Sequence, residues 1–206
     1  MVTKLVLGNQ LLPWIAATFN DQLNYKPIYL LRHPVAVCMS QLNTIAKIKP
    51  AQQFLFLQAD KRFKIFDTLN NERFIEYEKY LRTLETKIEI QVALWCINNK
   101  NLINKVKPQW IMVYYEDLLL NPEIEFKLLI KKIGLNDMVE NVHNVNFRNP
   151  SSTVYNSKFS QNPDEQLSKF LKIFTKEQLH KLQKVLDHFE IKTYTAFSPY
   201  PVKKKL

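Results

Sequence analysis

Two short, uninterrupted apolar segments stand out in the pattern of the chain. They cover residues 27–31 and residues 110–115. Continuous apolar runs of this length are typical of strands that are buried on both faces of a parallel sheet. Because the surrounding segments have helical spacing, we predict a helix-rich α/β fold with a small parallel sheet. Two strands cannot form the core of such a fold alone, so the sheet is expected to be incomplete.

Most of the remaining sequence carries its apolar positions at helical spacing. This pattern predicts helices over residues 11–19, 35–46, 50–69, 74–106 and 122–133, with two more after a polar loop at 144–162. Gly134 is expected to cap the helix that Pro122 begins. Thr175 and Gln178 have the spacing of a capping box at the start of the last helix. No repeat or linker divides the chain, so residues 1–206 are expected to form a single domain.

The charge of the chain indicates an anionic ligand without identifying it. There are 29 lysine and arginine residues against 19 acidic ones, a net charge of +10, and the excess lies toward the two ends of the chain. A basic surface attracts phosphates, sulfates, nucleic acid or acidic lipid.

Composition excludes several classes of site and of protein. Gly8 and Gly134 are the only glycines, so neither the dinucleotide loop G-x-G-x-x-G nor the phosphate loop G-x-x-x-x-G-K-[ST] is present. Cys38 and Cys96 lack metal-binding spacing and are expected to be buried thiols in a reducing compartment. No segment reaches the roughly 18 apolar residues of a membrane span, and the first residues do not resemble a signal peptide. We therefore expect a cytoplasmic protein without a metal site.

Arg32 is the residue with the clearest chemical potential. It follows the first predicted strand and precedes a helix that Pro34 begins. Ligands of open parallel sheets bind at the carboxyl ends of the strands, and a guanidinium there can hold a phosphate by two parallel hydrogen bonds. Ser40, two helical turns further on, could add a hydroxyl. From the residues alone, a phosphate-like anion and a structural ion pair are equally good readings of Arg32.

Residues 29–40, Y-L-L-R-H-P-V-A-V-C-M-S, resemble the 3′-phosphate-binding motif of PAPS-dependent sulfotransferases. In that motif an apolar strand is followed by Arg, Asp or Asn, and Pro, with a Ser eight residues after the Arg. His33 stands here in the place of the usual Asp or Asn. Residues 113–122 and 133–135 are similar to the family's Tyr-Glu-Asp-Leu segment and to the end of the helix that follows it. Residues 148–153 resemble the loop that closes over the nucleotide, and residues 171–194 resemble the closing helices.

The resemblance implies a P-loop-NTPase-like, three-layer sulfotransferase fold and the transfer of a sulfuryl group from PAPS to a hydroxyl or amine, without a metal. It implies that Arg32 and Ser40 bind the 3′-phosphate of PAPS or of the product PAP. The weaker auxiliary residues of that site would be Arg148, Ser151, Ser152 and Thr153. The family's amino-terminal strand, its 5′-phosphosulfate loop and its catalytic base are not identifiable in this sequence. We therefore expect the chain to be a truncated or inactive form, with no catalytic residue assigned.

Other candidate residues have structural readings that we favour. Glu116 and Asp117 are expected to anchor a loop and to lie at a helix start, and Trp95 is expected to pack in the core. His180 and His188 are read as surface residues because no third metal ligand accompanies them. The slot that His33 occupies is structural in the family, so we do not assign it as the base.

Two rival functions remain. The chain could be a non-enzymatic basic helical protein that binds nucleic acid or a protein partner, which would require lysines and aromatic residues along one exposed helix face. It could also be another nucleotide-phosphate transferase, such as a kinase, although no Gly-Lys-Ser/Thr sequence is present. The sulfotransferase reading, in contrast, includes neither a nucleic-acid partner nor a membrane span.

Overall fold

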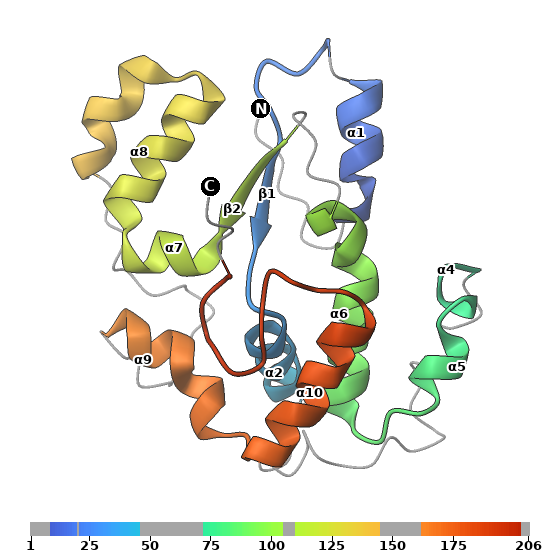
Figure 1. The fold of residues 1–206 in the computed structure, drawn as a ribbon. Helices are drawn as coiled ribbons and strands as arrows, with labels where there is room; N and C mark the ends of the chain where they lie inside the picture. The colour runs from blue at the N-terminus through green and yellow to red at the C-terminus, as the bar shows by residue number, and fades with distance from the viewer. Residues whose placement is uncertain (1–8, 20, 46–71, 105–109, 145–161, 203–206) are drawn as a thin grey trace.

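The computed structural model describes residues 9–19, 21–45, 72–104, 110–144 and 162–202. Helices dominate this part of the chain, around a two-stranded parallel sheet (Figure 1). The helices before the second strand are η1 (Asn9–Leu11), α1 (Leu12–Thr18), α2 (Pro34–Ile45), α4 (Glu72–Ile75), α5 (Glu78–Leu81) and α6 (Lys87–Asn104). Those after it are α7 (Tyr115–Leu120), α8 (Pro122–Ile133), η3 (Asn136–Asn144), α9 (Pro163–Ser168), η4 (Lys169–Lys172) and α10 (Lys176–His188).

The sheet pairs β1 (Ile28–Leu31) with β2 (Ile111–Tyr114). Their register runs from Ile28 opposite Ile111 to Leu31 opposite Tyr114. The two apolar runs are therefore the two strands of the described sheet, as predicted. The structure therefore confirms the prediction of a helix-rich α/β class with a small parallel sheet.

Two hydrophobic clusters cover the two faces of the sheet. Tyr29 and Leu31 are buried in the main core, to which α2, α6 and α10 contribute most. Ile111 and Val113 face the other way and pack on Leu129 of α8. On that second face the side chains of β1 are not covered, because Ile28 is 47% exposed and Leu30 is 53% exposed. Figure 1 shows the same division, with α7 and α8 on one side of the sheet and α1 and α6 on the other.

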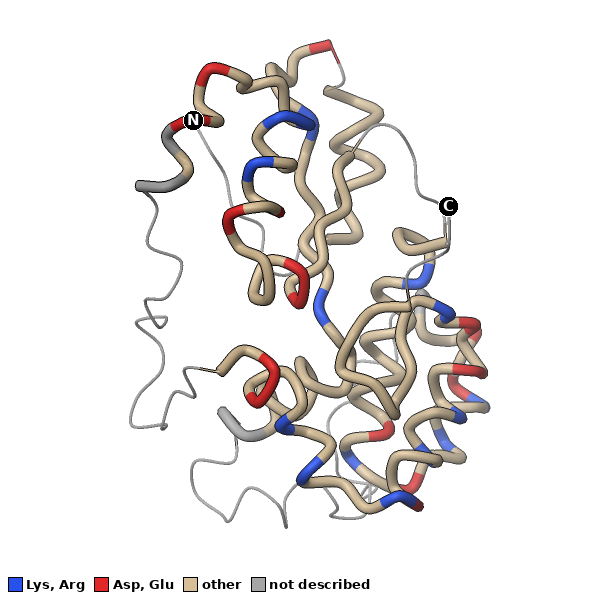
Figure 2. The backbone as a smooth tube through the Cα atoms, turned by 60° about the vertical axis from the view of Figure 1, so that its left-hand side comes forward, with Lys and Arg blue, Asp and Glu red and all other residues tan. Residues whose placement is uncertain are grey.

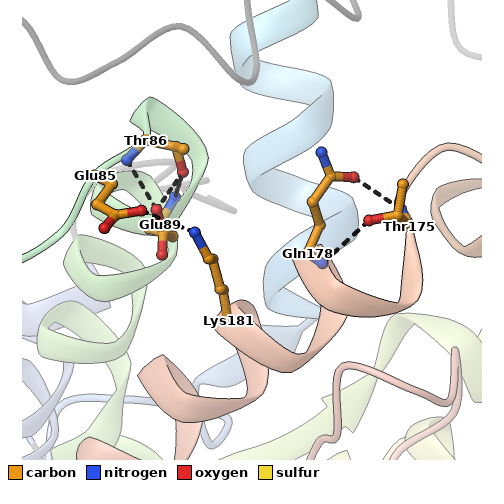
Figure 3. A network of polar contacts seen from close by, with 6 residues as sticks. All are labelled: Glu85, Thr86, Glu89, Thr175, Gln178 and Lys181. Atoms are coloured by element: carbon orange, nitrogen blue, oxygen red, sulfur yellow. Dashed lines mark hydrogen bonds and ion pairs between the residues drawn. The ribbon is translucent and has the colours of Figure 1, made fainter.

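The prediction of one continuous helix over residues 74–106 is wrong. The structure divides the region into α4, α5 and α6. The break before α6 has a local cause: the Thr86 N–H donates to Glu89 Oε2 (2.8 Å), and the Glu89 N–H donates to Thr86 Oγ1 (3.4 Å). This reciprocal pair has the spacing of a capping box and starts a new helix. Figure 3 shows it beside the ion pair of Lys181 with Glu85.

Other sequence predictions are confirmed. Gly134 caps α8 with φ 92°, in the left-handed region that glycine adopts without strain. Thr175 and Gln178 form both bonds of the capping box of α10 (Figure 3). Cys38 and Cys96 are buried free thiols. The predicted helix over 50–69 and nearly all of the predicted loop over 144–162 lie outside the described residues.

The second strand is one residue shorter at each end than predicted. Tyr115 already belongs to α7, which was not expected and which starts directly where β2 ends.

Among the described helices, none combines the length and the apolar character that crossing a membrane requires.

Candidate anion site at the carboxyl end of the sheet

Arg32 and Tyr115 lie side by side because their strands end in register. Each is the first residue after its strand, and the last strand residues, Leu31 and Tyr114, are paired. The Cζ atom of Arg32 lies 4.5 Å from the centroid of the Tyr115 ring. A guanidinium over an aromatic face is held by the ring quadrupole. The sheet register therefore positions the cation.

The residue that follows Arg32 is bound to the residue that follows Tyr115. The N–H of His33 donates a hydrogen bond of 2.7 Å to Oε1 of Glu116. The other carboxylate oxygen of Glu116 accepts a 2.9 Å hydrogen bond from the hydroxyl of Tyr194. Glu116 is fully buried, in the first turn of α7. The expected role of Glu116 as a loop anchor is confirmed, and its partners are the turn after β1 and the chain after α10.

His33 is a structural histidine. Its ring Nε2 lies 3.0 Å from the carbonyl oxygen of Thr195; since a carbonyl only accepts, Nε2 carries the hydrogen. The ring stacks on Phe170 and meets Tyr194 edge-on, with centroid separations of 4.5 and 5.0 Å. Burial lowers the pKa of His33 to about 4, against the smaller raising effect of nearby backbone carbonyls. A neutral, enclosed ring of this kind holds the turn rather than exchanging protons with a substrate.

Burial also raises the pKa of Glu116, and its hydrogen bonds and the charge of Arg32 oppose that shift. Arg32 itself forms no salt bridge with a carboxylate among the described residues. Its Nε is buried and has no hydrogen-bond partner there. A buried donor without a partner costs free energy unless a ligand or water satisfies it. Within the described part of the chain, the ion-pair reading of Arg32 therefore has no support.

The start of α2 faces the same corner of the molecule. Only Arg32 and His33 separate β1 from this helix, which Pro34 begins, and the N–H of Val37 donates to the His33 carbonyl (3.0 Å). The first N–H groups of a helix have no partner inside the helix and favour a negative charge. Since Pro34 has no N–H, the N–H groups of this terminus that the helix does not use are those of Val35 and Ala36, three and four residues after Arg32.

The structure does not show the other predicted site residues next to Arg32. Ser40 is exposed on α2, about two turns beyond Pro34, and its role in phosphate binding stays a prediction. Arg148, Ser151, Ser152 and Thr153 lie outside the described residues.

The remaining candidates have the structural roles expected of them. Trp95 packs against the main core and meets Tyr194 edge-on at 6.4 Å. His180 and His188 are exposed on α10, where His188 stacks on Tyr80. Within the described ranges, no group of three or more His, Cys, Asp and Glu side chains could hold a metal ion.

Sequence reasoning missed three residues of this site. Tyr115 could have been placed beside Arg32, because each directly follows one of two adjacent parallel strands. No local pattern identifies Tyr194 or Thr195, since their partners lie 78 and 162 residues away in sequence.

Comparison with known proteins adds no relative to this description. The sequence matches no protein-family model, no curated protein and no solved structure. The likeness to sulfotransferases therefore rests on the motif residues alone.

Proposed function

We propose that the chain binds the 3′-phosphate of PAPS or PAP at Arg32, as the nucleotide-binding part of a P-loop-NTPase-like, three-layer sulfotransferase. The observation that carries this proposal is the half-buried Arg32, whose Nε has no described partner and which lies between a parallel strand and a helix start. This is the position where open α/β sheets bind phosphate-bearing ligands. The resemblance of residues 29–40 to the 3′-phosphate-binding motif is the reason for proposing a 3′-phosphorylated nucleotide as this ligand.

Arg32 suits a phosphate ester because it is a cation held in a fixed orientation. Arg32 supplies a permanent cation with donors in a fixed plane, and the Tyr115 ring beneath it restricts the orientation of that plane. The Glu116 carboxylate lies near enough to interact with Arg32 electrostatically, but it is occupied by His33 and Tyr194. Binding would therefore not need to displace a salt-bridge partner of Arg32 among the described residues.

In the proposed reaction a sulfuryl group moves from PAPS to a hydroxyl or amine acceptor, whose proton a base accepts. The residues assigned here bind and orient the donor at a phosphate that does not react. Such binding stabilises the donor complex and the transition state about equally, so it lowers KM without raising kcat. We therefore propose that this chain by itself holds the nucleotide and does not turn it over.

The test is nucleotide discrimination. The melting temperature of the purified chain is measured with PAP and with AMP, which lacks the 3′-phosphate. We expect PAP to protect more than AMP, and we expect Arg32→Ala to weaken PAP binding about ten- to a hundredfold, since charged hydrogen bonds contribute about 1.5–3 kcal/mol. Arg82→Ala is the matched control, because Arg82 is an exposed arginine that pairs with Glu78 on the surface. Equal protection by PAP and AMP would overturn the proposal.

A second candidate, a basic protein that binds nucleic acid, has one observation in its favour. Lys176, His180, Lys184 and His188 are exposed and follow one another at four-residue spacing along α10. However, Glu177 and Asp187 are exposed on the same helix, and acidic and basic residues are interspersed in Figure 2. This candidate predicts salt-sensitive binding to nucleic acid that Lys184→Glu weakens and that Arg32→Ala leaves unchanged.

A further inference from the structure

We propose that Tyr194 is a positioning residue for the Arg32 site, and that anion binding there and docking of the C-terminal segment stabilise each other. The C-terminal segment is here residues 189–202. The inference rests on the proposed function only in requiring that Arg32 binds an anion; it does not require the nucleotide.

Three hydrogen bonds connect the turn after β1 to this segment. The N–H of His33 donates to Glu116 (2.7 Å), the hydroxyl of Tyr194 donates to the same carboxylate (2.9 Å), and His33 Nε2 donates to the Thr195 carbonyl (3.0 Å). His33, Glu116 and Tyr194 are each no more than 1% exposed. With the segment docked, water is excluded from these groups. Two of the three bonds, those of Tyr194 and Thr195, are made by the segment itself, and the third, from the His33 N–H to Glu116, shares its carboxylate with Tyr194.

Glu116 is the point through which the segment reaches the guanidinium. Its side chain holds the backbone of His33, the residue after Arg32. Its backbone is continuous with Tyr115, whose ring lies under the Arg32 guanidinium. Both supports of the cation are therefore attached to one residue, Glu116, and Oε2 of its carboxylate is held by Tyr194.

The segment is held by one hydrogen bond to α10 and by one that closes it on itself. The Ala196 N–H donates to the Gln183 side chain on α10 (2.7 Å). The Val202 N–H closes the segment by donating to the Thr193 carbonyl (2.7 Å). Docking costs conformational entropy of the segment. Burial of the Tyr194 ring and the hydrogen bonds to Glu116 and His33 favour it.

Removing the Tyr194 hydroxyl would leave Oε2 of Glu116 buried without this donor. A buried carboxylate that loses a donor must rotate, take up a proton or admit water, and each response disturbs the His33 turn. An effect of docking on anion affinity requires an equal effect of the anion on docking, because binding free energies are reciprocal. We expect Tyr194→Phe to lower anion affinity about five- to tenfold.

The experiment combines hydrogen–deuterium exchange with anion titration on the full chain. The probes are PAP and inorganic sulfate, and the variants are Tyr194→Phe and Tyr200→Phe. Tyr200 is the matched control, because it lies in the same segment and its hydroxyl bonds the exposed carboxylate of Asp164. In the wild type we expect the anion to slow exchange in residues 189–202. In Tyr194→Phe we expect faster exchange at the amide of His33, weaker anion binding and unchanged exchange in the middle of α6, while Tyr200→Phe behaves like the wild type.

The outcomes separate this inference from the proposed function. If PAP is no better than AMP but sulfate protects residues 189–202 through Arg32 and Tyr194, the nucleotide proposal fails and the coupling stands. If PAP binds and Tyr194→Phe leaves its affinity and the exchange of residues 189–202 unchanged, the coupling fails and the nucleotide proposal stands. If α6 also loses protection in Tyr194→Phe, Glu116→Gln replaces it. This variant keeps the shape of the side chain but turns one of the two oxygens that accept from His33 and Tyr194 into a donor group. Unchanged affinity in Glu116→Gln overturns the coupling. If neither anion binds the wild type, both proposals are overturned.

Discussion

The imidazole of His33 stacks on the ring of Phe170, with the centroids 4.5 Å apart and the ring planes inclined by 25°. This contact brings η4, late in the chain, onto the turn that follows β1. Together with the hydrogen bond to Thr195, it encloses the ring from sides that lie far apart in sequence. The imidazole makes contacts that a shorter side chain such as Asp or Asn would not reach, and it is buried in the core next to Arg32.

The first prediction concerns acid stability. Burial lowers the pKa of His33 from 6.5 to about 4 in the folded protein. Between these values the unfolded chain binds a proton that the folded chain does not. The free energy of unfolding should therefore fall as the pH falls from about 6.5 to 4, by up to about 3 kcal/mol from this residue.

Urea unfolding across that pH range, compared between the wild type and His33→Gln, isolates this contribution. Glutamine can still donate to the Thr195 carbonyl but does not titrate. Glu116, whose pKa is raised by burial, titrates in both proteins with the opposite sign. A difference between the two unfolding free energies that stays constant with pH would contradict the assignment.

The second prediction concerns the hydroxyl of Tyr29. The hydroxyl of this buried tyrosine donates to Oδ1 of Asn99 on α6, and the side-chain amide of Asn9 donates to the same Oδ1 (2.9 Å). The cluster therefore joins β1, α6 and the start of η1. Tyr29→Phe should lower the free energy of unfolding by about 0.5–1.5 kcal/mol, the usual net contribution of a hydrogen bond. Tyr200→Phe, which removes an exposed hydroxyl, should change it by less than about 0.5 kcal/mol; equal effects in urea unfolding would show that the cluster is not stabilising.

The third prediction concerns the uncovered side of β1. Leu30 is 53% exposed, whereas its neighbour Leu31 is 2% exposed on the opposite face. An exposed apolar side chain at a sheet favours self-association, so we expect Leu30→Thr to scatter less light than the wild type at matched concentrations, with a change in unfolding free energy of at most about 0.5 kcal/mol. Leu31→Thr should cost about 2–5 kcal/mol, because it removes apolar volume from the core. If Leu30→Thr aggregates as the wild type does, this face is not the source of association.

The fourth prediction is that the 206-residue chain does not transfer sulfate. Radiolabelled PAPS and a panel of hydroxyl and amine acceptors should give no labelled product, even at donor concentrations that saturate the Arg32 site. The physical reason is that the assigned residues bind the donor away from the reacting bond. Turnover that disappears in Arg32→Ala would show that a base and phosphosulfate contacts lie within this chain.

Local signals in the sequence predicted the framework of the site well. The two apolar runs became β1 and β2, and Pro34 and Pro122 began the helices expected of them. The break before α6 was also readable, since Thr86 and Glu89 have the spacing of a capping box. Continuous helical periodicity concealed it, because apolar spacing persists across a break when both helices pack on the same core.

The centre of the site was not predictable in the same way. Glu116 was recognised as an anchor, but the residues it anchors depend on how α7 and the C-terminal segment meet. Tyr194 is one of nine tyrosines, and nothing around it in sequence marks it. A buried carboxylate can be satisfied by any donor that the tertiary structure brings to it, so such partners emerge only from the assembled fold.

The hydrogen bond between His33 and Thr195 joins residues 162 positions apart, and this separation orders events during biosynthesis. While the chain is being made, β1 and the start of α2 leave the ribosome long before Tyr194 and Thr195 are added. During that interval the imidazole of His33 has neither its carbonyl partner nor the aromatic rings that shield it, and it titrates as an ordinary histidine. Contacts of such high sequence separation also form late in folding, because a long loop must close first. The nascent protein therefore completes the enclosure of the turn after β1 last, when Tyr194 and Thr195 reach Glu116 and His33.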